Sequence, residues 1–201
     1  MATPQLYKTT GIILKRTNSG EGDKIISVLC VHIGKKRFIG KGIRKINSRR
    51  SGHIELFSKT DFLIHRGKSL DYITGATVRH FFGTSYQTLA QVASAYTACE
   101  VIDRLIMEGQ EHDEAYMRLD RFLTDIATTL TENIPSLTKV YIDDILTVLG
   151  YRRKETESSS LGSAIASVER IIQRKIRSVN LFSKSGIDTF DGAKKPNFSS
   201  E

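Results

Sequence analysis

The chain has 201 residues, of which 39% are hydrophobic and 26% charged, and its formal net charge is +8 at pH 7. This composition is typical of a soluble globular protein of one large or two small domains. Its two cysteines, Cys30 and Cys99, each lie in an apolar stretch, which indicates buried free thiols. The opening residues lack the apolar core of a secretory signal, and no apolar run reaches the ~20 residues that span a bilayer, so we expect a cytoplasmic protein.

The charge is unevenly distributed along the chain. Residues 1–80 contain 16 lysines and arginines against 5 acidic residues, whereas residues 81–150 contain 4 against 11. Residues 151–201 are basic again, with 10 against 6. A basic first part predicts a polyanionic partner, and the acidic middle part should be repelled from that ligand.

The first part of the chain has the pattern of short antiparallel strands, because apolar and polar runs alternate every eight to twelve residues. Five strands are predicted, over residues 11–14, 25–31, 36–41, 53–65 and 71–82. A long basic loop separates the third strand from the fourth. This arrangement predicts a small Greek-key barrel of the OB type over residues 1–82, and a half-open five-stranded sheet or an SH3-like barrel fits the same pattern.

The rest of the chain is predicted to be helical, because apolar residues recur at every third or fourth position. Four amphipathic helices are predicted, over residues 85–108, 113–132, 135–150 and 161–179. Gly109 and Gly150 lie where helices should stop, and Pro135 lies at a first helical position. The sequence therefore predicts a multi-domain α+β protein, in which the barrel is followed by a helical bundle over 83–182 and a polar, flexible tail over 183–201.

The densest group of cations lies between residues 35 and 50 and contains no acidic residue. Its members are Lys35, Lys36, Arg37, Lys41, Arg44, Lys45, Arg49 and Arg50. Gly40, Gly42 and Gly52 bracket the second half, which indicates a loop whose backbone can approach a ligand closely. Such a cluster is suited to hold a polyanion by its phosphates, and a solvated loop that only keeps the protein soluble is the alternative. We predict that these eight residues contact nucleic acid.

A protein that grips single strands also needs aromatic rings on which unpaired bases can stack. Six aromatic residues of the barrel half are candidates, namely Phe38, Phe57, Phe62, Tyr72, Phe81 and Phe82. Phe38 lies between Arg37 and Gly40 and is the best placed of them, so we predict it as a stacking platform. A position in the barrel core is the alternative for any aromatic residue of a small barrel.

A second basic group is predicted on the fourth helix. Arg170, Arg174 and Arg177 recur at positions i, i+4 and i+7, a spacing that aligns side chains along one helical stripe. The stripe predicts a second phosphate track or a dock for an acidic peptide. A solvated helix face fits the same spacing.

The sequence shows no motif for catalysis or for a cofactor. Its five histidines lack the HxH, HxxxH and HExxH spacings of zinc sites. It contains no GxxxxGK[ST] phosphate loop and no serine nucleophile motif. The acidic run Glu111–Glu114 lies at a predicted helix start, where acids offset the helix dipole. We therefore expect a protein that is not an enzyme and that uses no metal, cofactor or small-molecule substrate.

Several short motifs resemble the bacterial recombination mediator family RecO. They are Tyr7-Lys8-Thr9-Thr10-Gly11-Ile12-Ile13-Leu14, Gly20-Glu21-Gly22-Asp23-Lys24-Ile25, Gly34-Lys35, Gly40-Lys41-Gly42-Ile43-Arg44, Ser48-Arg49, Leu56-Phe57, Ala95-Tyr96 with Glu100, and Leu149-Gly150-Tyr151. The resemblance covers residues 5–180 and is most specific over 7–57.

The resemblance implies an OB-fold domain followed by a helical domain. It implies binding of single- and double-stranded DNA, annealing of complementary strands, and help in loading recombinase together with RecR and the single-strand DNA-binding protein. DNA contacts would include Lys35, Lys41, Arg44 and Arg49, and the protein would be associated with the nucleoid. An RNA-binding or ribosome-associated module, and a protein–protein adaptor that acts through the bundle, are the two alternative functions.

The sequence departs from that family after Leu149-Gly150-Tyr151. Many members carry a four-cysteine zinc element at this point, whereas residues 152–160 contain no cysteine and lead into the fourth predicted helix. We therefore expect a short form of the family that lacks the zinc element.

Overall fold

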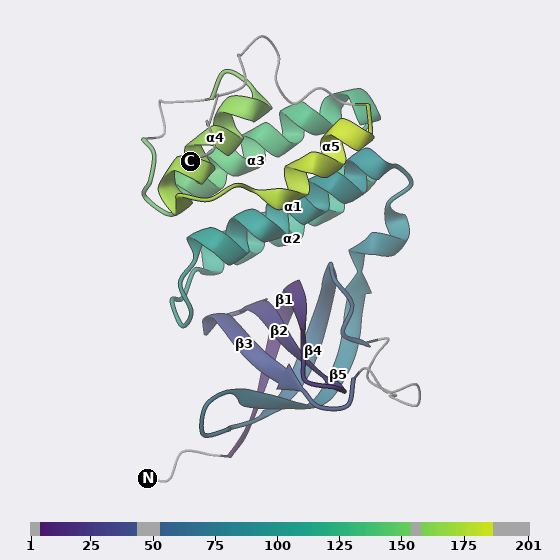
Figure 1. Ribbon diagram of the computed structural model, residues 1–201, viewed down its shortest axis with the longest axis vertical. Coiled ribbons are helices and arrows are strands. Elements are labelled where there is room, and N and C mark those ends of the chain that lie inside the picture. Colours follow the sequence, from purple (N-terminus) through teal and green to yellow (C-terminus); the bar gives the residue numbers. More distant parts are fainter. Residues whose placement is uncertain (1–4, 44–52, 154–157, 187–201) are drawn as a thin grey trace.

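The strands and the helices occupy opposite ends of the molecule (Figure 1). The structure, a computed structural model, describes residues 5–43, 53–153 and 158–186. The strands are β1 (Leu6–Ser19), β2 (Asp23–Cys30), β3 (Gly34–Gly40), β4 (Ser58–His65) and β5 (Asp71–Phe81). They form a closed barrel in the order β1-β2-β3-β5-β4, with β3 and β5 parallel. This architecture confirms the prediction of a five-stranded OB-type barrel followed by helices.

The barrel closes because β1 is long and belongs to both of its halves. Residues 6–12 of β1 pair with β4, and residues 11–19 pair with β2. The register shifts between Ile13 and Lys15, and such irregularities bend a strand and increase its twist. The buried side chains inside the barrel include Ile13, Ile26, Phe38, Phe62, Ile64 and Ile73.

Two strand boundaries differ from the predicted ones. β1 begins at Leu6, before the apolar run at Gly11, because its polar first half pairs with β4. β4 begins at Ser58, five residues after the predicted start at His53. The apolar residues Ile54 and Phe57 are buried without belonging to a strand, and Phe57 has a left-handed backbone with φ of 61°. Their burial explains why this segment resembles a strand in sequence.

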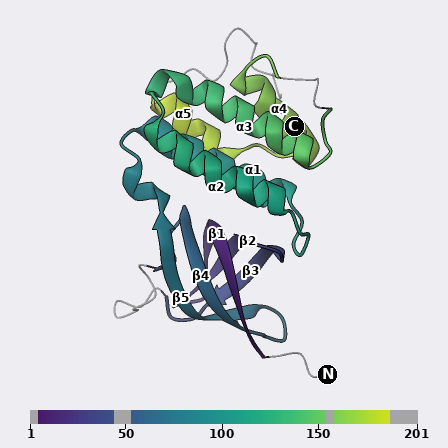
Figure 2. The same cartoon turned by 180° about the vertical axis from the view of Figure 1, so that it is seen from behind.

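The helical part contains five helices among the described residues. They are α1 (Leu89–Leu105), α2 (Asp113–Thr128), α3 (Ile134–Val148), α4 (Leu161–Ile172) and the short α5 (Asn180–Lys184). α1 starts at a capping box formed by Thr88 and Gln91, which satisfies backbone N–H groups at the helix end. α1 and α2 lie next to the barrel, and α3, α4 and α5 lie on their far side (Figure 2). None of these helices is both long and apolar enough to cross a bilayer.

The fourth helix is shorter than predicted and ends at Ile172 rather than Val179. Gln173 has a left-handed backbone with φ of 53°, which ends the helix. Glu169 stabilises the turn, because its carboxylate accepts hydrogen bonds from the backbone N–H of Ile176 and from Lys175 Nζ. Ile176 and Val179 are still buried in the same core, so the apolar spacing continues although the helix does not.

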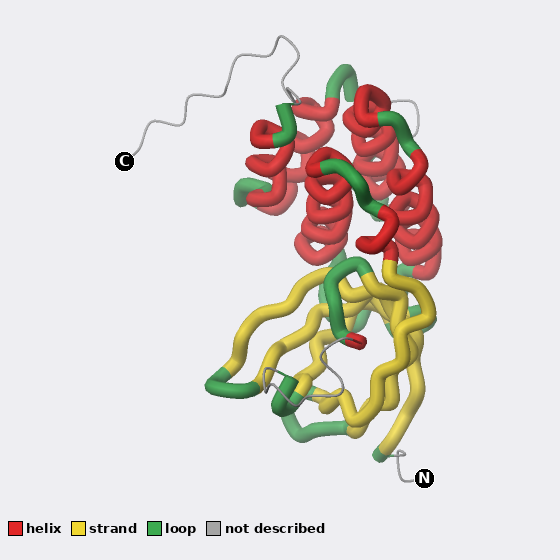
Figure 3. Tube along the Cα trace, turned by 90° about the vertical axis from the view of Figure 1, so that its right-hand side faces the viewer, coloured by secondary structure: helices red, strands yellow, loops and turns green. Residues whose placement is uncertain are grey.

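The barrel and the bundle share one apolar cluster. Ile12, Leu14 and Leu29 lie on strands but pack with buried residues of α1, such as Ile102. Figure 3 shows the strands and helices directly adjacent at this junction. Polar contacts surround the cluster, because Asp103 of α1 accepts a hydrogen bond from Ser27 Oγ of β2 at 2.7 Å. The junction therefore fixes α1 against the strands that carry the predicted nucleic-acid contacts.

Candidate nucleic-acid interface

The outward side chains of β1, β2 and β3 lie on one side of the barrel, which we call the β1–β3 face. Strand pairing aligns a first row across it, Lys15, Ser27 and Arg37. It aligns a second row, Thr17, Ile25, Ile39 and Tyr72, where Tyr72 is supplied by the parallel neighbour β5. The first row lies toward α1 and the second toward Lys41. OB-fold proteins bind nucleic acid on this side of the barrel.

Lys41, which is exposed, and Tyr72, which is half-buried, form the end of the β1–β3 face that lies away from α1. Lys41 follows the last residue of β3, and its ammonium lies 4.3 Å from the centroid of the Tyr72 ring. This is a cation–π contact. Lys41 is exposed and has no ion pair among the described residues. The Tyr72 ring lies close to the backbone of Gly67, where an added Cβ would be 2.8 Å from Tyr72 Cε2. The basic segment 44–50 follows Lys41 closely in the chain.

The cations at the other end of the face are paired with acids of the bundle. Lys15 Nζ lies 3.8 Å from the Asp103 carboxylate, and Arg37 Nε donates to Glu108 Oε2 at 2.8 Å. The acidic middle of the chain was expected to be repelled from a polyanion. In the structure its carboxylates also neutralise particular cations of the barrel.

Lys35 belongs to the junction rather than to the exposed surface. Its side chain is only 12% exposed, and Nζ donates to the backbone oxygen of Asp103 at 2.5 Å. Burial lowers the pKa of Lys35, although the nearby Asp103 and Glu108 oppose this shift. A phosphate would have to displace these contacts to reach Lys35, so Lys35 is poorly placed for the predicted role in DNA binding.

The prediction that Phe38 is a stacking platform is contradicted by its burial. Phe38 is 0% exposed and packs inside the barrel, with its ring centroid 6.1 Å from that of Phe62. Successive side chains of a strand point to opposite faces, so Phe38 points inward because Arg37 and Ile39 point outward. Tyr72 is the aromatic residue that the fold brings beside Lys41. The parallel β3–β5 pairing places it there, and that pairing is not visible in the sequence.

The remaining predicted contacts have different positions. Lys36 is partly buried and alternates with Arg37, on the same side of β3 as Phe38. Arg44, Lys45, Arg49 and Arg50 lie outside the described residues, so their roles stay predictions.

The predicted helical track of three arginines is also contradicted. Arg170 lies in the last turn of α4, Arg174 follows the left-handed Gln173, and Arg177 opens a 3₁₀ turn. All three side chains are exposed. They do not lie along one helical stripe, because the helix ends between the first and the second.

A groove of about 1070 Å³ lies on the other side of the barrel, among β1, β4, β5 and the start of α2. Two of its cations are committed to acids, with Lys59 Nζ 2.9 Å from Asp120 and Arg79 Nε 2.7 Å from Asp61. Among the described residues that line the groove, Lys8 is the one cation without an ion pair. No aromatic ring of these described residues is available for stacking, because Phe62 and Tyr116 are buried. The β1–β3 face is therefore the better candidate.

The barrel residues match a known family. Residues 1–82 match the family model described as Recombination protein O N terminal. Residues 1–82 are therefore similar to the N-terminal part of the RecO family. The chain is 31% identical to the DNA repair protein RecO of Roseiflexus sp. (strain RS-1) over 161 residues, which are 80% of this chain and 56% of that protein.

Two further RecO proteins give similar matches. The chain is 29% identical to the RecO of Dehalococcoides mccartyi (strain ATCC BAA-2266 / KCTC 15142 / 195), over 80% of this chain and 62% of that protein. It is 31% identical to that of Desulforamulus reducens (strain ATCC BAA-1160 / DSM 100696 / MI-1), over 65% of this chain and 51% of that protein. The chain thus spans about half to three fifths of the length of these relatives.

Part of the RecO-like motif Gly34-Lys35 has a structural explanation. Gly34 has a φ of 69°, and an added Cβ would lie 1.7 Å from the backbone oxygen of Gln110. The absence of a side chain therefore lets the loop between α1 and α2 approach β3. Lys35 holds Asp103 at the same junction. No group of three or more His, Cys, Asp or Glu residues suited to hold a metal occurs in the ranges that the structure describes.

Proposed function

We propose that the chain binds single-stranded DNA through the β1–β3 face and the basic segment 41–50, and that it acts in DNA repair as a recombination mediator. The observation that carries the proposal is the exposed Lys41 ammonium over the Tyr72 ring, at the point where the chain enters the basic segment. A cation beside a partly exposed aromatic ring can bind a phosphate and stack a base of the same strand.

The proposed mechanism is electrostatic and needs no covalent step. Lysine and arginine side chains replace the counterions around the phosphates, which reduces the repulsion between two strands. Complementary bases then pair while the strands are held close together. Sequence preference should be slight, because phosphate contacts carry no sequence information. Double-stranded DNA would bind through the same phosphate contacts.

The relatives support the repair role by their name, DNA repair protein RecO. The resemblance further supports annealing, recombinase loading, and partnership with RecR and the single-strand DNA-binding protein. These finer activities belong to the proposal. The bundle is the part of the chain that the proposal leaves for protein partners, because its acids oppose a polyanion.

The salt dependence of binding tests the proposed site. For the full chain and a short single-stranded DNA, the logarithm of the affinity should fall linearly with the logarithm of the salt concentration. Lys41→Ala should reduce the slope by roughly 0.7, the value for one phosphate contact to a single strand. Replacing Lys41, Arg44, Lys45, Arg49 and Arg50 together should reduce it severalfold more.

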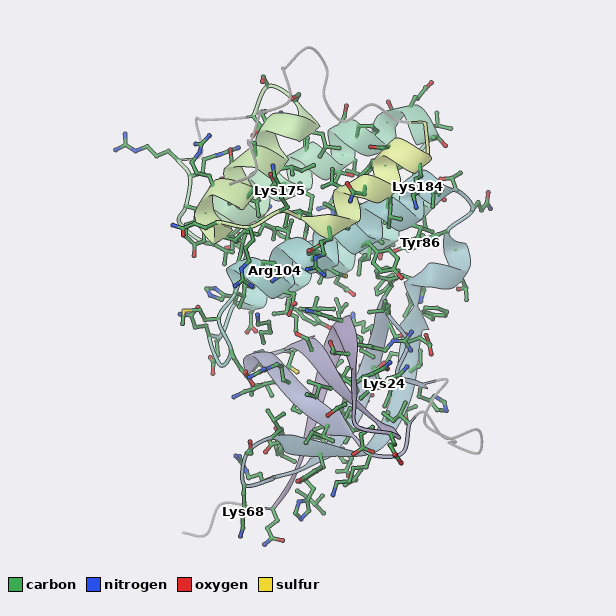
Figure 4. All side chains as sticks on the ribbon, viewed as in Figure 1. Lys24, Lys68, Tyr86, Arg104, Lys175 and Lys184 are labelled. Carbon is green, nitrogen blue, oxygen red and sulfur yellow. The ribbon has the colours of Figure 1, made fainter. Side chains whose placement is uncertain are left out.

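Lys184→Ala is the matched control, because Lys184 is an exposed lysine on α5, in the bundle (Figure 4). It should leave the slope unchanged. An equal effect of Lys41→Ala and Lys184→Ala would reject the site. Competition with single-stranded RNA of the same length tests the alternative that the chain binds RNA. A face that contacts only phosphates and base planes should not prefer RNA to DNA.

A further inference from the structure

The loop between α1 and α2 is fixed along an edge of β3 by its backbone. The N–H of Gly109 donates to the carbonyl oxygen of Lys35 at 2.8 Å, and Lys35 and Glu108 form an isolated parallel bridge. Gln110 approaches Gly34 so closely that only glycine leaves room for it. Backbone contacts on both sides of Glu108 therefore hold this residue at the border of the β1–β3 face.

The Glu108 carboxylate accepts from two donors of Arg37, the side-chain Nε and the backbone N–H. Oε2 accepts from Arg37 Nε at 2.8 Å, and Oε1 accepts from the Arg37 backbone N–H at 3.3 Å. The Arg37 side chain is 54% exposed, so a strand on the face could reach it. A guanidinium binds carboxylates and phosphates through the same forked N–H groups. The Glu108 carboxylate thus lies where a phosphate bound at Arg37 Nε would lie.

We infer that Glu108 is a built-in competitor for phosphate at Arg37, so that a bound strand is confined to the Lys41 end of the β1–β3 face. This inference rests on the proposed function. Asp103 also opposes phosphate binding, at the middle of the first row. Its carboxylate accepts a hydrogen bond from Ser27 and lies 3.8 Å from Lys15 Nζ. The two carboxylates repel phosphates from the side of the face that borders α1.

The strength of this competition is limited by the exposure of the pair. Exposed ion pairs contribute little to stability, so Glu108→Gln should leave the fold intact. The substitution releases Arg37 for one additional phosphate. Affinity for single-stranded DNA near ~0.1 M salt should rise about threefold to tenfold, and the salt slope should steepen by roughly 0.7.

Four variants of the full chain test the inference in the same salt titration. They are Glu108→Gln, Arg37→Ala, the double variant, and Glu111→Gln. Glu111 is an exposed acid of the same loop with no ion pair among the described residues, so Glu111→Gln makes the same change in net charge without freeing Arg37. Arg37→Ala should remove the whole gain in the Glu108→Gln background.

The outcomes separate the inference from the function on which it rests. Equal effects of Glu108→Gln and Glu111→Gln would overturn the inference, because only net charge would then matter. A gain that persists in the double variant would also overturn it. Binding that depends on Lys41 but not on Glu108 would leave the proposed function standing. Absence of DNA binding by the unaltered chain would overturn both. Far-UV circular dichroism and thermal unfolding of each variant check that the fold is kept.

Discussion

Two lysines near the opposite ends of β3 have different surroundings. Lys35 and Lys41 belong to the same acid-free run of sequence. Lys35 is buried against Asp103 of α1, whereas Lys41 is exposed over the ring of Tyr72. The difference arises because α1 covers one end of the strand and not the other. A run of cations in sequence therefore contains both structural and ligand-facing residues, and tertiary contacts decide which is which.

The same comparison applies to the aromatic residues of the barrel. Phe38 and Tyr72 lie on neighbouring strands and in adjacent registers, since Ile39 is the partner of Tyr72. Phe38 points into the barrel and Tyr72 points out, because side chains alternate along each strand. Only the outward ring can stack a base. In each pair, Lys35 with Lys41 and Phe38 with Tyr72, the first residue should affect stability and the second DNA binding. Mutation of each residue can test this difference.

The largest expected effect is on stability and comes from Phe38→Ala. Removing a fully buried phenylalanine should lower the free energy of unfolding by about 3–5 kcal/mol, because it removes buried apolar area and leaves a cavity. Tyr72→Ala should instead weaken binding of single-stranded DNA by about 1–3 kcal/mol, the range for loss of one stacking ring. Urea unfolding and DNA titration of both variants measure the two quantities. A stable Phe38→Ala variant with weakened DNA binding would reverse our assignment.

A smaller effect is expected from Lys35→Met, which keeps the apolar stem and removes the ammonium. The loss of the hydrogen bond to Asp103 should lower the free energy of unfolding by about 1–2 kcal/mol. The salt slope of DNA binding should not change, because Lys35 is not in reach of a phosphate.

Lys41→Met is the matched variant for that test. It should leave unfolding within about 0.5 kcal/mol of the unaltered chain, as is usual for surface positions, and should reduce the salt slope. If Lys35→Met reduces the slope as much as Lys41→Met does, then DNA binding must open the junction between the barrel and α1.

The sequence predicts the fold better than the site. Alternating and helical periodicities report which side chains are buried, and they identify all five strands and the four longer helices. They fail at Ile54, which is buried before β4 begins, and at Ile176, which is buried after α4 has ended. The partners of each cation depend on contacts between distant segments, such as Arg37 with Glu108. Neither periodicity nor local charge contains that information.

The smallest predicted effect concerns an exposed pair at the junction, His32 and Asp113. The Asp113 carboxylate of α2 accepts from the His32 backbone N–H at 2.8 Å and lies 2.7 Å from His32 Nδ1. These hydrogen bonds, the backbone one first, hold the pKa of Asp113 below its usual value of 3.8. The unfolded chain therefore binds more protons in this range, and the stabilising contribution is present above pH 3.8 and is lost as the pH falls through the lowered pKa.

Asp113→Asn should remove this part of the acid dependence. Thermal unfolding between about pH 2 and pH 6 should show a slightly shallower loss of stability for Asp113→Asn than for the unaltered chain, and DNA binding at neutral pH should be the same. The measurement compares Asp113 with Lys35. Both residues join the barrel to the bundle, but the Asp113 side chain is more exposed than the Lys35 side chain, which is only 12% exposed. An effect of Asp113→Asn as large as that of Lys35→Met would mean that the exposed pair, and not the buried contact to Asp103, holds the two parts together.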